Sequence, residues 1–303
     1  MVEKSTVQIF EMKRMMKVKN HRMKRTIIVM LCMVLVLSGI FLFVLQKEPE
    51  IKMIPEAHTE PEQPDAEMED VPVEIEYVDK TPLVNLDDLE PGTLIQKERI
   101  VIENLDQYFT YGEIETDIYE RILGKSYPEN ARISLDELRY LKLLHYNYDH
   151  EIQVGELIVN RQIAQNCVDI FRELFELEYE IESMRLIDNY WTGDAVDSDT
   201  NSISNNNTSA FNYRTVPGTT SLSKHAKGLA IDVNPLQNPY VTYNSDGSFA
   251  RVYKDMELYL DRDSGKEHMI THQDEAYRIF TKYGFFWGGD WNSMKDYQHF
   301  EKE

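Results

Sequence analysis

One uninterrupted apolar run divides this chain. Residues 26–45 carry no charge, and only Thr26 and Ser38 interrupt their apolar character. About 20 such residues are what an α-helix needs to cross the hydrocarbon core of a bilayer. Lysines and arginines crowd the segment from Lys13 to Arg25, which predicts a cytoplasmic N-terminus and an exported C-terminal part. A cleaved signal peptide is the alternative, but Gln-Lys-Glu-Pro at 46–49 is a poor cleavage site, which favours an uncleaved anchor.

Composition then predicts four parts. Residues 1–25 form a cytoplasmic basic segment, 26–46 a transmembrane signal anchor, 47–96 an extracytoplasmic linker, and 97–303 the folded domain. The linker is rich in Glu, Asp and Pro and poor in aromatics, so it cannot bury enough apolar surface to offset its ordering entropy. Acidic repulsion and proline favour an extended tether.

Charge and cysteine content exclude several classes of function. The net charge of −21 argues against a nucleic-acid partner, because phosphate contacts need clustered Lys and Arg. The two cysteines are Cys32, in the apolar run, and Cys167. The exported part therefore cannot form an internal disulfide, and any metal site there must use His and carboxylate ligands.

Hydrophobic spacing predicts helices first and short strands later. A capping box, Ser134 to Glu137, predicts a helix that continues through Leu138, Leu141 and Leu144. The expected helices are 114–122, the one opened at 134, 160–177 and 274–283; the expected strands are 179–187, 229–233, 285–287 and 299–301; residues 191–208 are expected to be a long loop. Without regular βαβ alternation, the order favours an α+β domain with a small, mainly antiparallel sheet and helices packed around it.

Two short segments carry the chemistry. In the first, His225 and Asp232 are seven residues apart, and Gly228 between them allows a sharp turn into a strand. Strand alternation puts Asp232 on the face opposite Ile231 and Val233. A carboxylate in so apolar a strand is costly to bury unless it is paired or bound to metal. Taken singly, His225 is equally compatible with a surface loop and Asp232 with a strand-end turn.

The second segment adds Asp296, three residues before His299, after a Trp287-Gly-Gly-Asp290-Trp291 run. A catalytic zinc site needs three protein ligands, an open position for water, and a nearby proton acceptor. The two imidazoles and two carboxylates of these segments can supply all of them. A core histidine with a polar neighbour is the alternative reading.

His268 and His272, four residues apart, form a competing pair. No Glu follows His268 to complete the usual zinc-protease helix motif, so we expect both to be solvated surface histidines.

The motifs Ser223-x-His-x-x-Gly-x-Ala-x-Asp232, Gly284-Phe-x-Trp-Gly-Gly-Asp-Trp291 and Asp296-x-x-His-Phe300 resemble those of the M15 peptidases. This family includes D-alanyl-D-alanine carboxypeptidases and L-alanyl-D-glutamate endopeptidases. The resemblance covers roughly 97–303 and is closest to a membrane-anchored bacterial branch. It implies a Hedgehog/DD-peptidase-like fold for a zinc metallopeptidase domain.

The resemblance also implies roles. His225, Asp232 and His299 correspond to the zinc (Zn2+) ligands, and Asp296 to the catalytic base. An arginine stabilises the oxyanion in the family; Arg185 has the matching topology and is slightly favoured over Arg214, which has the closer local motif. Ser223 corresponds to a position near the substrate or the metal, although it can also simply cap the loop. Trp287 and Asp290 are expected to contact substrate.

The implied activity is hydrolysis of an amide bond in the peptidoglycan stem peptide, with the domain anchored outside the cell membrane by its helix. The cleaved bond is either L-Ala–D-Glu or D-Ala–D-Ala. A non-catalytic, zinc-containing wall-binding or signalling module of the same fold is the alternative.

Overall fold

The computed structural model describes residues 81–216, 218–251 and 254–303, all within the unit of residues 74–303. The predicted basic segment, the predicted transmembrane helix and most of the predicted linker lie outside the described residues. Among the residues that are described, no helix is both long enough and apolar enough to span a bilayer.

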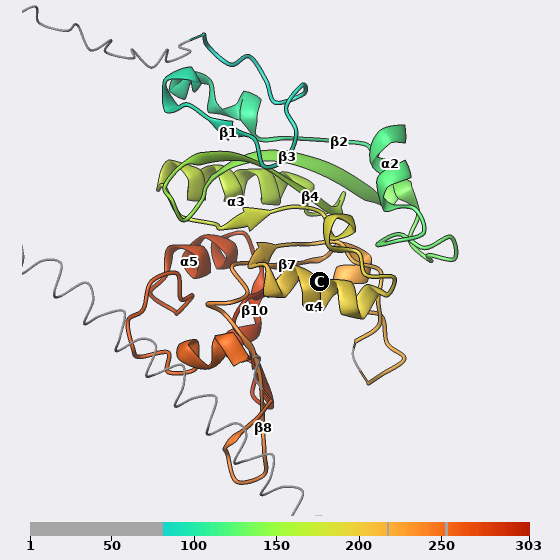
Figure 1. Ribbon diagram of the computed structural model, residues 1–303, viewed down its shortest axis with the longest axis vertical. Helices are drawn as coiled ribbons and strands as arrows, with labels where there is room; N and C mark the ends of the chain where they lie inside the picture. The colour runs from blue at the N-terminus through green and yellow to red at the C-terminus, as the bar shows by residue number, and fades with distance from the viewer. Residues whose placement is uncertain (1–80, 217, 252–253) are drawn as a thin grey trace, which may run out of the picture. The chain divides into compact units, whose positions relative to one another are not determined.

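The largest sheet is antiparallel, with the order β1-β4-β3-β2. Its centre is a long hairpin of β3 (Leu138–Tyr146) and β4 (Ile152–Asn160), flanked by the short strands β1 (Leu94–Ile95) and β2 (Thr110–Gly112). In Figure 1 this hairpin lies between the N-terminal segment and the elements α4, α5 and β7.

The helix predicted after Ser134 is wrong. The capping box does form, with the Ser134 N–H donating to Glu137 Oε2 at 3.0 Å, but it opens only the 3-10 turn η3 (Leu135–Glu137). The following residues form β3, which pairs with β4 along its full length. Leu141, Leu143 and Leu144 are all fully buried, so both faces of this strand are covered. A strand that is apolar on both faces lacks the alternation that would distinguish it from a buried helix.

Helix α3 (Ala164–Glu176) packs on this sheet and carries the predicted apolar face. Its Phe171 ring meets Phe280 of α5 (Glu275–Lys282) edge-on, at 6.1 Å between centroids. Helix α3 begins later than predicted because Asn160 ends β4, and its side-chain oxygen accepts the Gln162 N–H at 3.1 Å. Helix α5 matches the predicted 274–283 helix closely, and the side chain of Asp274 caps it by accepting the Ala276 N–H.

The region predicted to be a long loop, 191–208, contains a helix, α4 (Ala195–Ser204). Asp194 caps it by accepting the backbone N–H groups of Val196 and Asp197. Ser198 is fully buried and donates its hydroxyl to the Asp194 carbonyl at 2.6 Å. Hydrogen-bonded serines take the buried positions that apolar residues usually occupy, so the helix has little hydrophobic signature.

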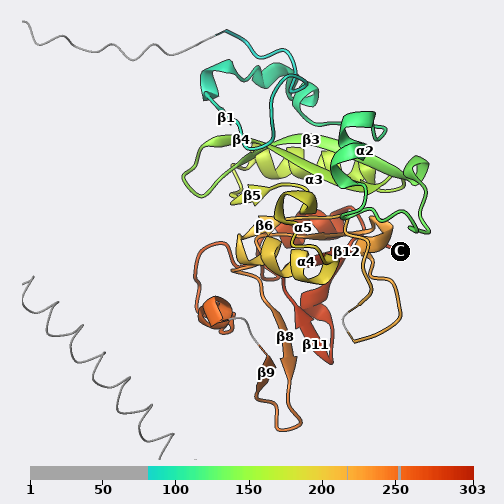
Figure 2. The ribbon, with the colours of Figure 1, turned by 45° about the vertical axis from the view of Figure 1, so that its right-hand side comes forward.

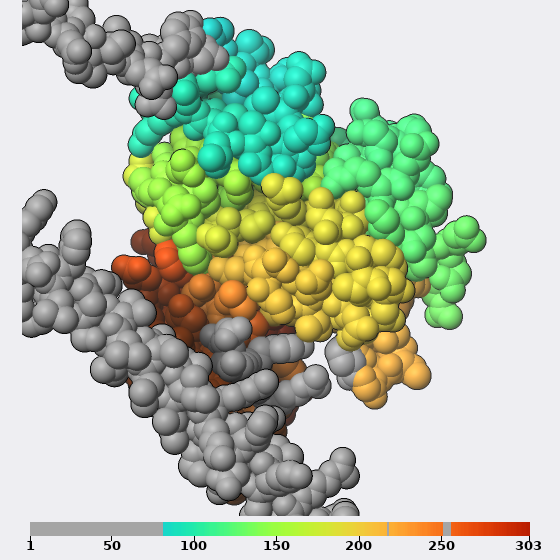
Figure 3. Space-filling view, viewed as in Figure 1, coloured from blue at the N-terminus to red at the C-terminus, as the bar shows by residue number. Residues whose placement is uncertain are grey.

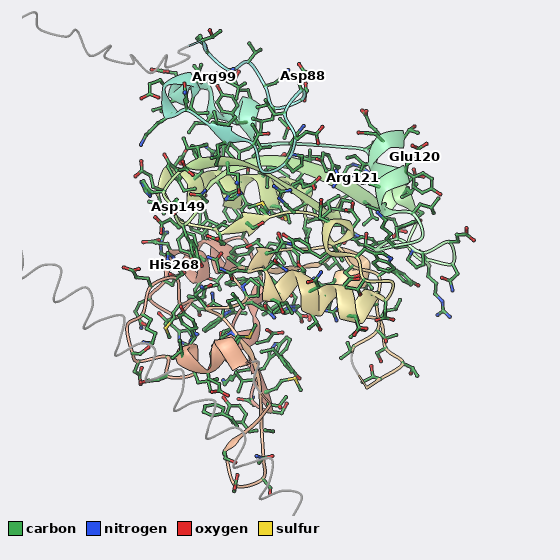
Figure 4. The ribbon with its side chains drawn as sticks, in the orientation of Figure 1. Asp88, Arg99, Glu120, Arg121, Asp149 and His268 are labelled. Carbon is green, nitrogen blue, oxygen red and sulfur yellow. The ribbon has the colours of Figure 1, made fainter. Side chains whose placement is uncertain are left out.

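Helix α2 (Thr116–Ile122) matches the predicted 114–122 helix closely. Its Arg121, labelled beside Glu120 in Figure 4, makes two hydrogen bonds of 2.7 and 2.9 Å to the carboxylate of Glu156 in β4. Glu156 is fully buried and also accepts the Tyr140 hydroxyl at 3.0 Å. These charge-assisted bonds compensate for burying a carboxylate in the sheet.

Three small sheets complete the domain. The predicted 179–187 strand is reduced to β5 (Ser183–Met184), which pairs in parallel with β6 (Asn207–Thr208), because Ile187 already begins a 3-10 turn. The predicted strands 229–233, 285–287 and 299–301 appear as β7 (Ala230–Asp232), β10 (Phe286–Trp287) and β12 (His299–Glu301), joined in the order β10-β12-β7. The last sheet joins β11 (Met294–Asp296), β8 (Tyr240–Tyr243) and β9 (Phe249–Arg251), which run together away from α4 and α5 in Figure 2. Antiparallel pairing dominates, as expected for the α+β class.

The folded part begins earlier than residue 97. Leu83 and Leu86 are buried in the main core, and the Tyr108 hydroxyl donates to the Leu83 carbonyl at 2.6 Å. Residues 81–96, predicted to belong to the linker, therefore pack against the domain, where Figure 3 shows them in cyan. The apolar residues of this segment, among them the buried Leu83, Leu86 and Ile95, are interspersed with Asp, Glu, Pro and Gly, so no helical or strand period marks it in the sequence.

Candidate metal centre

Two imidazoles and one carboxylate converge between β7 and β12. One ligand atom from each of His225, Asp232 and His299 lies within 4.8 Å of the others. His225 Nε2 is 3.2 Å from Asp232 Oδ2 and 3.2 Å from His299 Nδ1, and His299 Nδ1 is 2.9 Å from Asp232 Oδ1. All three residues are at most 5% exposed. The structure thus brings together the three residues that the sequence predicts to be metal ligands.

Strand pairing positions two of them. His299 of β12 lies directly opposite Asp232 of β7, so their side chains rise from the same face of the sheet. The other face holds Ile231 and Phe300, and Phe300 stacks on Phe280 of α5 at 4.2 Å. Alternation along the strands therefore separates the apolar core from the polar centre.

A tight turn positions the third. His225 begins the 3-10 turn η5 (His225–Lys227), which ends at Gly228 with a left-handed φ of 64°. A Cβ at Gly228 would lie 2.6 Å from the backbone nitrogen of Asn160, and the Gly228 carbonyl accepts that N–H at 2.7 Å. Only glycine fits both the conformation and the approach to β4.

The outer nitrogens of both imidazoles are anchored. His225 Nδ1 lies 2.6 Å from the Ala210 carbonyl, so Nδ1 carries the hydrogen and the lone pair of Nε2 faces the centre. His299 Nε2 lies 3.2 Å from Glu301 Oε2, which leaves Nδ1 facing Asp232. An outer carbonyl or carboxylate that fixes the tautomer and ring orientation is the usual second layer of a metal site. Glu301 is not among the residues predicted from the sequence, although its place two residues after His299 puts both on one face of β12.

The electrostatics match a site for a dication. Burial favours the neutral carboxyl, but His225 and His299 outweigh it and hold the pKa of Asp232 well below its usual range. Burial likewise disfavours a charged His299, but hydrogen bonds to Asp232 and Glu301 raise its pKa to about 10. An ionised carboxylate thus lies between two imidazoles. Two nitrogens and a carboxylate oxygen form the donor set that suits zinc, with room for a fourth ligand.

Asp296, the predicted base, lies at the end of β11 beside this group. Burial and the charge of Asp232 raise its pKa to about 7. Its Oδ1 is buried and has no hydrogen-bond partner among the described residues. A Cβ at Gly288 would lie 2.6 Å from the Asp296 carbonyl oxygen and 3.2 Å from His299 Cβ, so the first glycine of the Trp-Gly-Gly-Asp run lets the chain pass under both residues. A buried carboxylate oxygen without a partner, on a residue beside this centre, fits a metal site in which a water would be its partner.

The two arginine candidates lie in different places. Arg214 is next to the first motif, where its carbonyl accepts the Ser223 N–H at 3.0 Å. Its guanidinium is 10% exposed and pairs with Asp199 of α4 at 2.8 Å. Arg185, in contrast, packs its guanidinium against Gly92 in the N-terminal segment. Through Ser223, Arg214 is thus connected to the turn that carries His225, whereas Arg185 contacts the N-terminal segment.

The three predicted substrate-binding residues have structural partners. The Ser223 hydroxyl accepts the His225 N–H at 3.2 Å and so caps the turn that carries the ligand. Trp287 is 4% exposed and donates its indole N–H to the Tyr297 carbonyl at 2.8 Å. Asp290 is half exposed, and its carboxylate lies 2.7 Å from His272 Nε2. Trp291, which the sequence analysis did not single out, is closer to the centre, with its ring 5.3 Å from that of His299.

His268 and His272 do not share a helix. His268 has a left-handed φ of 61° and stacks on Tyr148 at 3.7 Å, beside Asp149 in Figure 4. His272 pairs instead with Asp290. Neither belongs to a metal-capable group in the part of the chain that the structure describes.

A comparison with known protein families agrees with this geometry. Residues 217–302 match an M15 peptidase family described as D-alanyl-D-alanine carboxypeptidase. The matched segment contains His225, Asp232, Asp296 and His299. None of the curated proteins or solved structures compared with the chain matches it.

Proposed function

Since the segment 217–302 identifies this chain as an M15 family peptidase, we propose that it is a zinc-dependent peptidase of the peptidoglycan stem peptide. One observation carries the proposal: His225, Asp232 and His299 converge within 4.8 Å, with Asp296 beside them. The proposal extends to a Hedgehog/DD-peptidase-like fold and to an extracytoplasmic domain held at the membrane by the apolar run at 26–46.

Zinc would be held by His225 Nε2, His299 Nδ1 and the Asp232 carboxylate, and when bound it supplies a Lewis acid that activates water and polarises a carbonyl. Glu301 and the Ala210 carbonyl keep the two rings turned toward it. Asp232 contributes the negative charge that partly neutralises a dication. With zinc bound both imidazoles would be neutral, so the dication and one carboxylate would make a net positive centre, which would favour a carbonyl oxygen as its charge develops.

Asp296 would transfer a proton from the attacking water to the departing amine. With a pKa near 7, it is partly ionised at neutral pH and accepts a proton from the attacking water. It then returns this proton to the nitrogen of the departing amine, which cannot leave as an amide anion. An acceptor with a pKa near the working pH serves both steps better than an ordinary carboxylate.

Arg214 would stabilise the oxyanion. Its position beside Ser223 supports this role, and the ion pair with Asp199 limits the directions in which the guanidinium can point. One preorganised donor of this kind typically contributes about 3 kcal/mol to transition-state stabilisation.

Muropeptide digestion tests the function. Purified protein with zinc is incubated with disaccharide pentapeptides, and the products are weighed by mass spectrometry. The description of the matched family favours loss of a terminal D-Ala. Release of the peptide that begins at D-Glu, with L-Ala left on the disaccharide, would instead identify an L-Ala–D-Glu endopeptidase. An Asp rather than a Glu at position 296 favours that activity.

The controls address the non-catalytic alternative. A chelator must abolish the reaction, and added zinc must restore it. No hydrolysis of any muropeptide by protein that holds stoichiometric zinc would favour a wall-binding or signalling module.

A further inference from the structure

A second cavity adjoins the metal centre. It has a volume of about 420 Å³ and lies over the edge of the β10-β12-β7 sheet. Five aromatic rings and three carboxylates dominate its lining, among them Tyr277, Phe286, Trp291, Asp290, Glu301 and Glu303. No Lys, Arg or His lines it. We call this cavity the Phe286 pocket.

Two residues of the pocket lining contact His299 of the metal centre. Glu301 lines the pocket and is bonded to His299 Nε2, and Trp291 lines it with its ring 5.3 Å from that of His299. Phe286 lies directly opposite Glu301 across the β10–β12 pairing, so it shares the sheet face that carries His299 and Asp232. A group bound in this pocket would therefore lie next to His299, one of the three predicted ligands.

Packing within the domain does not explain why a phenylalanine occupies position 286. It is 58% exposed, whereas its neighbour Trp287 turns into the core and is 4% exposed. An exposed phenylalanine at the mouth of a pocket is a ready contact for a ligand, and aromatic faces attract both alkyl chains and cations.

The carboxylates of the lining determine which charge a ligand of this pocket should carry. Asp290 is engaged by His272, and Glu301 by His299, whereas no described residue bonds to the side chain of Glu303. A free carboxylate beside aromatic faces, with no cation in the lining, favours an alkyl stem that ends in an ammonium group. A sugar ring can also stack on the aromatics and donate its hydroxyls to a carboxylate, but it carries no cation to pair with the negative charge.

We propose that the Phe286 pocket is a specificity subsite for a substrate side chain with a terminal ammonium, such as the diamino acid of a stem peptide. Phe286 and Trp291 contact the alkyl stem, and Glu303 pairs with the ammonium. This rests on the proposed function and names the part of the substrate that the site selects. Glu301 is left out of the test because it also orients His299.

The test compares two peptides that differ in one charge. One is L-Ala-γ-D-Glu-L-Lys-D-Ala-D-Ala; the other carries the same lysine acetylated on its side-chain nitrogen. The variants are Phe286→Ala and Glu303→Gln, both at exposed positions. Phe249→Ala and Glu267→Gln are matched controls, since Phe249 is 48% exposed on β9 and Glu267 is exposed outside the pocket. Two measurements are made on the full chain with zinc: kcat/KM, and equilibrium binding at a pH or temperature where turnover is negligible.

We expect the native chain to favour the free amine over the acetylated peptide by about 3- to 10-fold in kcat/KM and in affinity, a range typical of one cation–π contact and one exposed ion pair. Each pocket variant should reduce this ratio to about 2 or below, and the controls should keep it. The subsite proposal is overturned if the native chain shows the same kcat/KM and affinity for both peptides, or if it binds neither peptide. So does a loss in the pocket variants that is the same for both peptides, which would indicate sugar stacking or a structural role. If neither peptide is hydrolysed but the free amine binds more tightly, the proposed bond cleavage fails and the subsite stands.

Discussion

Glu301 Oε2 lies 3.2 Å from His299 Nε2, on the same strand face as the ring that it holds. This contact leaves the opposite ring nitrogen, Nδ1, for the metal centre. The ligand geometry therefore depends on a residue that is not itself a ligand.

Glu301→Gln should weaken zinc binding by about 10- to 100-fold, because a neutral amide fixes the imidazole less firmly and makes it less basic. Competition with a chromophoric chelator measures the affinity. Glu267→Gln, at an exposed position away from the centre, serves as the control and should bind zinc like the native chain. Equal affinities for the native chain and Glu301→Gln would show that Glu301 has no part in positioning the ligand.

Asp296→Ala should keep stoichiometric zinc but lower kcat by about 10²- to 10⁴-fold, since it removes the proton acceptor and no ligand. His225→Ala should lose both metal and turnover. Metal analysis and steady-state kinetics on the same preparations separate the two effects. Native kcat from Asp296→Ala with bound zinc would contradict the role of base.

Arg214→Lys should lower kcat by about 10²- to 10³-fold, because lysine cannot reproduce the geometry of the guanidinium. Arg185→Ala should change kcat little, since Arg185 packs against Gly92 in the N-terminal segment. Thermal unfolding of both variants checks that the fold survives. The reverse ranking of the two variants would return the oxyanion role to Arg185.

The stability of the domain should fall between pH 4 and pH 6 through Asp274. Burial raises the pKa of this carboxyl to about 6, above its ordinary 3.8, although it caps α5. The folded state therefore prefers the neutral form, and the stability contributed by that form is fully present below about pH 4 and is lost as the pH rises through 6. The pKa difference corresponds to a loss of up to about 3 kcal/mol in the free energy of unfolding.

Asp274→Asn keeps an oxygen for the Ala276 N–H and the Tyr179 hydroxyl, and it removes this titration. Denaturant unfolding at several pH values should show the variant to be more stable than the native chain at pH 7 and equal to it near pH 4. The exposed Asp117→Asn is the control for general loss of charge. A constant difference across this pH range would exclude Asp274 as the source.

Gly228→Ala should destabilise the domain and lower zinc affinity, because alanine is strained at this φ and its Cβ would meet the Asn160 backbone. Gly247 has a similar φ of 81° but nothing within 4 Å of a Cβ. Gly247→Ala therefore isolates the conformational strain, about 1–2 kcal/mol. In chemical unfolding, Gly228→Ala should lower the free energy of unfolding clearly more than Gly247→Ala does. Equal losses would mean that the chain at Gly228 can move away from β4 to make room for the Cβ.

The sequence alone indicated the four polar residues of the centre, the glycine of its turn and the α+β class. These depend on local properties: donor chemistry, the conformational range of glycine, and short apolar periods. The anchor at 26–46 and the binding of zinc remain predictions.

Tertiary structure alone decided the rest. Leu138 to Tyr146 is a strand because β4 and the packed layers bury both of its faces, which erases the alternation that identifies strands. Residues 195–204 are a helix because buried hydroxyls are hydrogen-bonded within it. His299 lies beside Asp232 and His225 because strand pairing and a turn bring segments that are far apart in the chain together. Contacts between residues far apart in the chain leave no periodic trace in the sequence, so only the folded arrangement shows them.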